Sequence, residues 1–211
     1  MIYIRSGVFL FGLAIFSFGI SLTINMQHLG LHPWDVLSVA MYDKVGLSIG
    51  SWNIIIGIVL ICVALILDRT YVKLGTFINA VIVGSLVDFY LWLDFLPTAS
   101  HTWTDIVIIS LGIIIMGVGG GVYNSAGVGS GPRDGFMLSI SDRTGYSIGR
   151  VRIVTELGVL VIGLLIGGPV FIFTFIFTFI QSPIFQFVYL KCVETLHQIE
   201  RRVRGENTRA I

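Results

Sequence analysis

Charged residues are scarce in this chain. Lys, Arg, Asp and Glu together make up 12% of its 211 residues, whereas 55% of the residues are hydrophobic. A soluble domain carries roughly 25% charged residues, and several apolar stretches here reach the ~20 residues that span a bilayer as a helix. The composition therefore excludes an ordinary soluble domain. It predicts an all-α integral membrane protein that has the lipid bilayer as a partner.

The residue groupings of common enzyme and cofactor sites are also missing. The four histidines are scattered along the chain, and its two cysteines, Cys62 and Cys192, lie too far apart to suggest a disulfide or a cysteine metal site. His28 and His32 have the spacing of zinc ligands on a helix, but the proline that follows interrupts that helix. The glycine-rich run 117–121 lacks a Gly-Lys-Ser/Thr sequence, so it is not a nucleotide-binding loop. We expect no enzymatic activity, cofactor, metal site or nucleic-acid partner.

Six apolar stretches predict six transmembrane helices, at about 6–27, 51–67, 74–93, 105–124, 151–168 and 170–190. If the N-terminus is cytoplasmic, twelve of the thirteen Lys and Arg residues fall on the cytoplasmic side and only Lys44 falls outside. Basic residues accumulate in cytoplasmic loops. The distribution therefore predicts a multi-pass protein of the plasma membrane with both termini in the cytoplasm.

An internal repeat relates the two halves of the chain. Residues 25–54 match residues 124–153 at a constant offset of 99, with ten identities that are mainly Gly, Pro, Asp and Ser. Each copy holds three predicted spans, and two tandem copies with an odd number of spans must have opposite orientations in the membrane. We therefore predict one membrane domain over residues 1–191 that consists of two inverted three-helix repeats, at about 6–96 and 105–191. Residues 192–211 should form a basic amphipathic tail on the inner leaflet.

Each repeat also contains a short segment, Pro33–Val45 in the first and Pro132–Thr144 in the second. Thirteen residues make a helix of about 20 Å, which is too short to cross a core of about 30 Å. Proline suits the first helical position, and Gly46 and Gly145 are placed to end the helices. The segments are either re-entrant half-helices, interfacial helices that lie flat, or plain cap-and-turn elements. In each copy a serine should cap the span that follows.

The candidate site residues are acids and amides inside or between the predicted spans. An acid within a span is costly and is a functional candidate by default, and an acid in the first turn of a helix is stabilised by the helix dipole. Arginine at a half-helix entrance can recognise a carboxylate or phosphate, although it can equally be a cytoplasmic anchor, and an amide in a span can serve only to join two helices. The predicted substrate site is lined by Asp35, Asp134, Asp88 and Asn79, with Arg133 at its inner mouth.

Several motifs in the chain resemble the YczE/YitT-type family of bacterial integral membrane proteins, in particular its YczE branch. The motifs are Gly30–Leu37, Gly75–Ala80, Gly127–Gly135, Gly145–Gly149 and the sequence Gly-Gly-Pro at 167–169. The resemblance covers nearly the whole chain up to about residue 190. It implies a polytopic protein of the bacterial plasma membrane with a transporter-like character.

Two functions therefore compete at the level of sequence. The first is a small transporter for a small molecule or an ion, with its site between the two half-helices near the bilayer midplane. The alternative is a regulatory or scaffold membrane protein that acts through a protein partner and transports nothing. Glycine-rich spans are compatible with close helix packing, and a homo-oligomer is therefore among the expected assemblies.

Overall fold

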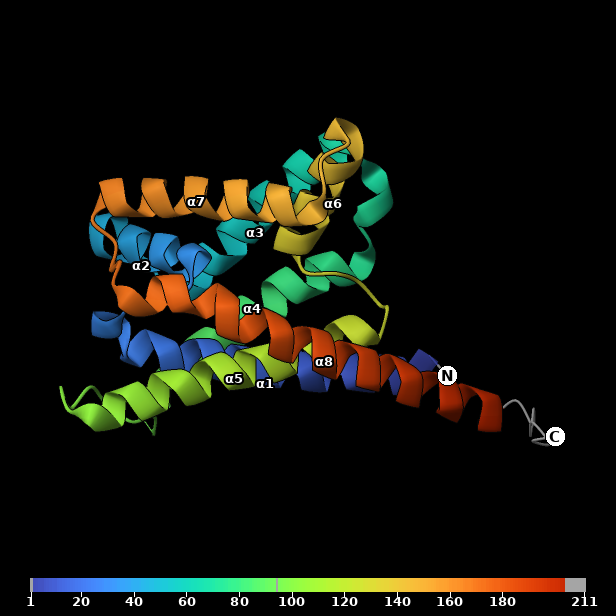
Figure 1. Ribbon diagram of the computed structural model, residues 1–211, viewed down its shortest axis with the longest axis horizontal. Coiled ribbons are helices and arrows are strands. Elements are labelled where there is room, and N and C mark those ends of the chain that lie inside the picture. The colour runs from blue at the N-terminus through green and yellow to red at the C-terminus, as the bar shows by residue number, and fades with distance from the viewer. Residues whose placement is uncertain (1, 94, 204–211) are drawn as a thin grey trace.

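A computed structural model describes residues 2–93 and 95–203, and within these ranges the chain forms helices and loops but no strand. The elements are α1 (Ile2–Asn25), η1 (Gln27–Leu29), α2 (Pro33–Val45), α3 (Ile49–Leu67), η2 (Arg69–Tyr71), α4 (Leu74–Trp92), α5 (Trp103–Ser125), α6 (Pro132–Thr144), α7 (Ile148–Ile166) and α8 (Ile172–Val203). In Figure 1, α1, α5 and α8 run side by side in the lower half, and α2, α3 and α7 lie above them.

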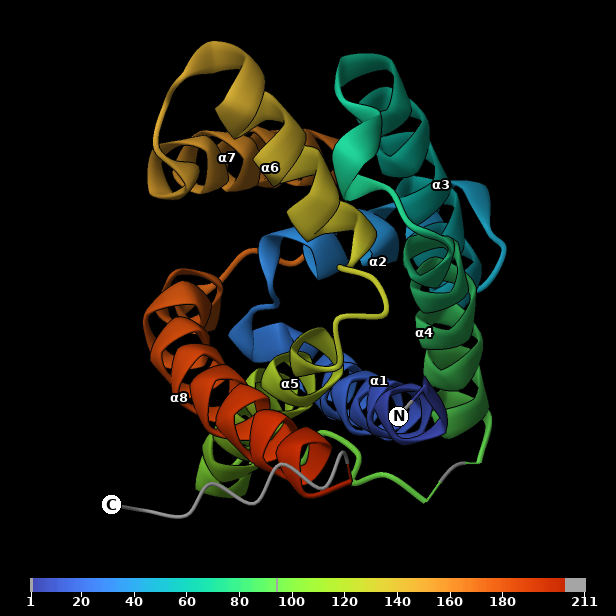
Figure 2. The same cartoon turned by 90° about the vertical axis from the view of Figure 1, so that its right-hand side faces the viewer.

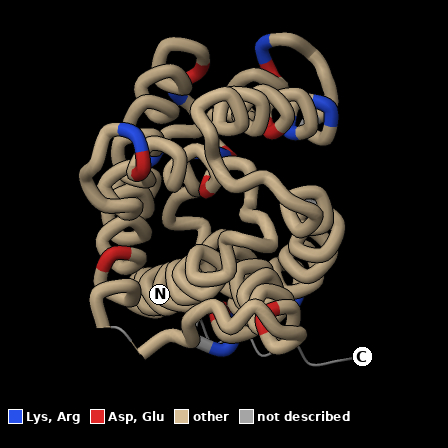
Figure 3. Tube along the Cα trace, turned by 90° about the vertical axis from the view of Figure 1, so that its left-hand side faces the viewer, with Lys and Arg blue, Asp and Glu red and all other residues tan. Residues whose placement is uncertain are grey.

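Five helices in the described ranges are long and apolar enough to cross a membrane, namely α1, α3, α4, α5 and α8. They coincide with five of the six predicted spans and confirm a multi-pass membrane protein. The remaining predicted span, 151–168, falls on α7, which has the required length but carries Arg150, Arg152 and Glu156. Figure 3 shows long stretches of the tube without charge and a small group of charged positions near the centre.

The two short segments form α2 and α6 with the predicted bounds, and each helix has its proline at the first helical position. Proline is suited to that position because the backbone N–H there has no partner within the helix. The offset of 99 also relates the bounds of α3 to those of α7. The repeat seen in the sequence thus extends to the helix boundaries.

The caps of these helices match the predictions only in part. Gly145 ends α6 in the left-handed conformation, at φ 73° and ψ 5°, whereas Gly46 ends α2 at φ 85° and ψ −151°, outside that region. Ser48 caps α3 because its Oγ accepts a hydrogen bond of 3.0 Å from the backbone N–H of Ser51. The equivalent Ser147 makes no side-chain cap bond, so that prediction is wrong. Ser147 is exposed, and water can satisfy the free N–H groups of an exposed helix end.

The main core lies where α1 packs along α5 and α5 packs against α8, as Figure 2 shows in a view close to the helix axes. Glycine permits this close approach. A Cβ atom on Gly19 of α1 would lie 2.8 Å from the backbone nitrogen of Met116, and one on Gly121 of α5 would lie 2.9 Å from the carbonyl oxygen of Phe185. The glycines of α5 therefore serve helix packing, as the sequence indicated.

The predicted boundary between the membrane domain and its tail is not a helix boundary, because α8 continues unbroken to Val203. The Nε of Arg5 donates a 2.7 Å hydrogen bond to Glu200, and its Nη1 donates a 3.0 Å bond to the carbonyl oxygen of Ala126. These contacts join the end of α8 to the start of α1 and the end of α5. The rest of the predicted tail, 204–211, lies outside the described residues.

Candidate functional site

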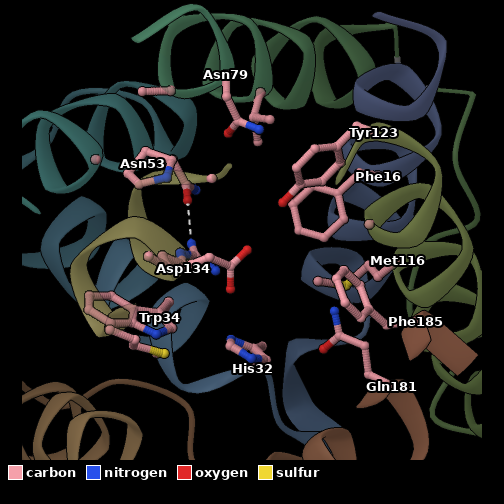
Figure 4. A pocket seen from close by; sticks show the side chains of 18 of the residues that line it. Phe16, His32, Trp34, Asn53, Asn79, Met116, Tyr123, Asp134, Gln181 and Phe185 are labelled. Atoms are coloured by element: carbon pink, nitrogen blue, oxygen red, sulfur yellow. Dashed lines mark hydrogen bonds between the residues drawn. The ribbon is translucent and has the colours of Figure 1, made fainter. Parts of the chain in front are cut away.

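A cavity of about 110 Å³ lies between the short helices α2 and α6 and the long helices around them (Figure 4). Most of its polar side chains come from α3, α4, α6 and α7, together with the segment before α2. The opposite side is formed by α1, α5 and α8, which contribute apolar side chains such as Phe16 but also the polar Tyr123, Gln181 and Ser182. The polar lining residues include His32, Asn53, Asn79, Tyr123, Arg133, Asp134, Arg152, Glu156, Gln181 and Ser182, and the apolar ones include Phe16, Met116, Met137 and Phe185.

The N-terminus of α6 supplies the acid of this cavity. Pro132 begins the helix and Asp134 lies in its first turn, where the helix dipole favours a negative charge. The Oδ1 atom of Asp134 accepts a hydrogen bond of 3.2 Å from Arg152 of α7. Figure 4 shows the carboxylate of Asp134 pointing into the cavity. This predicted site residue is therefore accessible to a ligand while it is held by a cation.

The N-terminus of α2 approaches that of α6 through a buried ion pair. Asp35 is fully buried, and its Oδ1 accepts a 3.1 Å hydrogen bond from Nη2 of Arg133, which also donates a 2.8 Å bond to Asn53. The guanidinium lies 5.5 Å from the ring centroid of Trp34, within the range of a cation–π contact. Arg133 therefore lies between the N-termini of α2 and α6 and supplies the compensating charge that a buried carboxylate requires.

Asp88 is not among the residues that line the cavity. It lies nine residues after Asn79 on α4, which corresponds to about 13 Å along a helix. Its carboxylate accepts hydrogen bonds from the hydroxyl of Ser48 and, at 2.8 Å, from the backbone N–H of Gly50. Asp88 thus satisfies the first turn of α3. Of the five predicted site residues, Asn79, Arg133 and Asp134 line the cavity, and Asp35 is joined to it through Arg133.

The sequence did not assign Arg152, Glu156 and Tyr123 to the site. Arg152 lies 3.8 Å from Glu156, one helical turn away, and Glu156 lies 3.9 Å from His32. The sequence does show Arg152 and Glu156 as an oppositely charged pair at i and i+4 within an otherwise apolar helix. This pattern also suits a simple salt bridge. Tyr123 is 5% exposed, and nothing in the sequence distinguishes it from an interfacial tyrosine.

Several buried polar atoms at this site have no hydrogen-bond partner among the described residues, including Nε1 of Trp34, Nδ2 of Asn79, Nδ1 of His32 and Oδ2 of Asp35. Leaving such a group unsatisfied costs roughly 1–3 kcal/mol. Buried polar groups in proteins are usually paired. This concentration at one place provides donors and acceptors that a polar ligand can use.

Comparison with known proteins gives a consistent result. A model described as "Family of unknown function (DUF6198)" matches residues 3–189. The chain is 36% identical to the uncharacterized membrane protein YczE of Bacillus subtilis over 88% of its own length and 86% of that protein. It is 31% identical to the uncharacterized protein YyaS of the same organism over 92% of this chain and 96% of that protein. An uncharacterized protein of Haemophilus influenzae is 29% identical over 93% of this chain and 88% of its own length. No solved structure matches the chain significantly.

Proposed function

The chain belongs to the DUF6198 family, and from that premise we propose that it is a small transporter for a small molecule or an ion. The observation that carries the proposal is the position of the cavity. It contains ionised side chains, lies among helices that are apolar enough for lipid, and receives the N-termini of both half-helices. Charged groups inside a membrane domain are expensive and mark substrate or ion sites.

The packing of the helices supports an inverted repeat. The half-helix α2 of the first copy packs on α7 of the second, and α6 of the second packs on α3 of the first. Within the copies the packing also corresponds, since α1 packs on α4 in the first and α5 packs on α8 in the second. The exchange of α2 and α6 between the copies is expected of two copies related by a two-fold axis in the membrane plane, and transporters of that type bind substrate near the midplane between broken helices. We therefore place the site there, with both termini cytoplasmic.

One difference between the copies supports a route into the cavity. Helix α3 packs closely against α4, whereas the corresponding helices α7 and α8 are not extensively packed within the described part of the chain. Arg152 and Glu156 of α7, and Gln181 and Ser182 of α8, all line the cavity. The space between α7 and α8 is therefore the side on which a modest helix movement would open the site.

A ligand screen on the purified protein tests this function. Amino acids, organic acids, phosphates, amines and inorganic cations are added to the protein in detergent and its thermal unfolding is followed. A ligand at a hundred times its Kd should stabilise the protein by about 2.7 kcal/mol. The stabilisation should be lost in Asp134→Asn and kept in Asp142→Asn, which removes a carboxylate from an exposed part of the same helix.

Transport itself is then tested with the compound that binds in the screen. Vesicles that contain the protein should take this compound up. A ligand whose effect is the same in Asp134→Asn as in the wild type would rule out the proposed site. If a well-folded protein responds to no compound in the screen, the regulatory function becomes the better explanation. In that case, purification from its native membrane should recover a stoichiometric partner.

A further inference from the structure

A second hollow lies away from the cavity, between the end of α6 and the start of α7, which are neighbours in Figure 2. Its volume is about 340 Å³. The side chains that line it from each helix are spaced one turn apart and so project from one face of that helix. They are Ile140 and Thr144 of α6 and Arg150, Val151, Val154 and Thr155 of α7. None of these residues lines the cavity that contains Asp134, so this hollow, named here the α6–α7 groove, is separate from it.

The wall of the α6–α7 groove consists mainly of hydrocarbon. Three of its residues, Ile140, Val151 and Val154, are aliphatic. The hydroxyls of the two threonines are already used, because Oγ1 of Thr144 donates a 2.7 Å bond to the carbonyl oxygen of Ile140 and Oγ1 of Thr155 donates a 2.7 Å bond to that of Val151. The threonines therefore add methyl groups to the wall, and the groove suits a hydrocarbon chain.

The α6–α7 groove opens on a surface that is itself apolar. Val154 is 70% exposed, and other large apolar side chains of α7 are exposed along the rest of the helix, up to Leu165 at 82%. A continuous exposed apolar surface of this kind marks contact with a membrane or with another protein. Since the protein is a multi-pass membrane protein, acyl chains of the bilayer are the hydrocarbon available to this surface.

The α7 end of the groove carries a positive charge. Arg150 lies in the first turn of α7 and is exposed, and its guanidinium makes no hydrogen bond or ion pair within the described part of the chain. The arginines near it are occupied, since Arg143 donates to the carbonyl oxygen of Leu67 and Arg152 binds Asp134. A guanidinium can bind a phosphate through two parallel hydrogen bonds. Arg150 therefore offers a phosphate the one free cation of this groove.

A tyrosine marks the depth of this charge in the membrane. Tyr146 lies in the turn before α7 and also lines the α6–α7 groove, and tyrosine is typical of the boundary between lipid and water. In the orientation proposed above, the start of α7 lies on the cytoplasmic side. The inner leaflet there is the one that carries anionic lipids.

We propose that the α6–α7 groove binds an anionic phospholipid, with one acyl chain along the aliphatic wall and the phosphate at Arg150. A dry cavity of about 150 Å³ holds a benzene molecule, so 340 Å³ has room for roughly a dozen carbon atoms of one chain. The inference goes beyond transport, because it concerns a surface outside the cavity. The bound lipid packs against the end of α6, the helix whose first turn supplies Asp134 to the cavity.

Native mass spectrometry of the full chain, released from detergent micelles, tests the charge. Phosphatidylglycerol and phosphatidylcholine with identical oleoyl chains are titrated separately, and the bound fractions give apparent Kd values. Phosphatidylglycerol should bind at least about fivefold more tightly, and Arg150→Gln should remove this difference. The matched control is Arg69→Gln, which removes the same charge from an exposed arginine of η2 outside the groove and should keep the difference.

A second pair of variants tests the groove itself. Val154→Trp fills the groove with a larger side chain and should weaken the binding of phosphatidylglycerol at least about tenfold. Its control, Val161→Trp, lies two turns further along α7, is 54% exposed and does not line the groove, so it should bind as the wild type does.

Three results would overturn the proposal. The first is equal binding of the two lipids by the wild type. The second is unchanged binding of phosphatidylglycerol in both Arg150→Gln and Val154→Trp. The third is a lipid-free dimer that Val154→Trp dissociates, because a second copy of the chain would then cover the groove.

Discussion

Breaking the ion pair between Asp35 and Arg133 should strongly destabilise the protein where the N-termini of α2 and α6 meet. The Asp35 side chain is 0% exposed and that of Arg133 is 22% exposed, with 3.1 Å between Oδ1 and Nη2. At that distance two unit charges attract by about 5 kcal/mol at an effective dielectric constant of ~20. Removing one partner of a buried pair typically costs about 3–5 kcal/mol, because the other charge remains buried without compensation.

The experiment is a double-mutant cycle with Arg133→Met, Asp35→Asn and the double variant. We expect Arg133→Met to lower the free energy of unfolding by about 3–5 kcal/mol, and Asp35→Asn to lower it by about 1–3 kcal/mol. The double variant should lose clearly less than the sum of the two, because neither charge is then left alone. Unfolding by increasing SDS in mixed micelles provides the free energies.

Arg143→Met is the matched control. Arg143 lies on the same helix, is exposed, and its side chain donates a 3.3 Å bond to the carbonyl oxygen of Leu67. Such a substitution should change the free energy of unfolding by no more than about 0.5 kcal/mol. The reasoning is refuted if Arg133→Met costs no more than this control. It is also refuted if the effects of Arg133→Met and Asp35→Asn add within about 0.5 kcal/mol, which is the behaviour of independent sites.

Three further predictions follow from the packing and the orientation. Gly75→Ala should lower the free energy of unfolding by about 1–3 kcal/mol, because its Cβ would lie 2.5 Å from a carbonyl oxygen of the loop after α5. Gly158 has open space around it, so Gly158→Ala should be neutral or stabilising in the same unfolding assay. Asp88→Asn should cost about 1 kcal/mol through the start of α3 but leave ligand affinity in calorimetry unchanged; a large loss of affinity would place Asp88 in the site after all. In a cysteine-free background on intact cells, a membrane-impermeant maleimide should label Thr98→Cys but not Thr70→Cys, and the reverse result would invert the proposed orientation.

The helices of this protein could be predicted largely from local chemistry. The bounds of α2 and α6 agree with the prediction because each is marked by a proline at one end and a glycine at the other, and those residues act through the backbone. The sequence predicted a separate amphipathic tail from residue 192, whereas the same helix continues from α8 to Val203. A helix can extend beyond the bilayer when tertiary contacts such as Arg5 with Glu200 hold its end.

The site could be predicted only in part, because side-chain direction depends on how the helices pack. Asp134 was predicted from its place in the first turn of a short helix and Asn79 from its polarity within a span, and both line the cavity. Asp88 is likewise polar and lies within a span, yet its position about 13 Å further along α4 than Asn79 directs it to the start of α3. Tyr123 could not be singled out, since a tyrosine in a span becomes a polar ligand only when its hydroxyl faces a cavity.

The contact between the N-termini of α2 and α6 explains one position at which the two copies differ in sequence. Trp34 and Arg133 occupy equivalent positions in the two copies, and the guanidinium of one lies 5.5 Å from the ring of the other. If arginine stood at both of these equivalent positions, their contact would bring two like charges together. An aromatic ring and a cation instead form a favourable pair. The difference between the copies is therefore a consequence of their contact.

The acids kept in both copies are compensated in two different ways. Asp35 and Asp134 are equivalent, as are Asn53 and Arg152. In the second copy, Arg152 binds Asp134 directly. In the first copy, the amide of Asn53 carries no charge, and Arg133 reaches across from the other half to bind both Asn53 and Asp35. Each carboxylate thus has one guanidinium as its partner. Only the carboxylate of Asp134 faces the cavity, so the repeated sequence produces one site and not two equivalent ones.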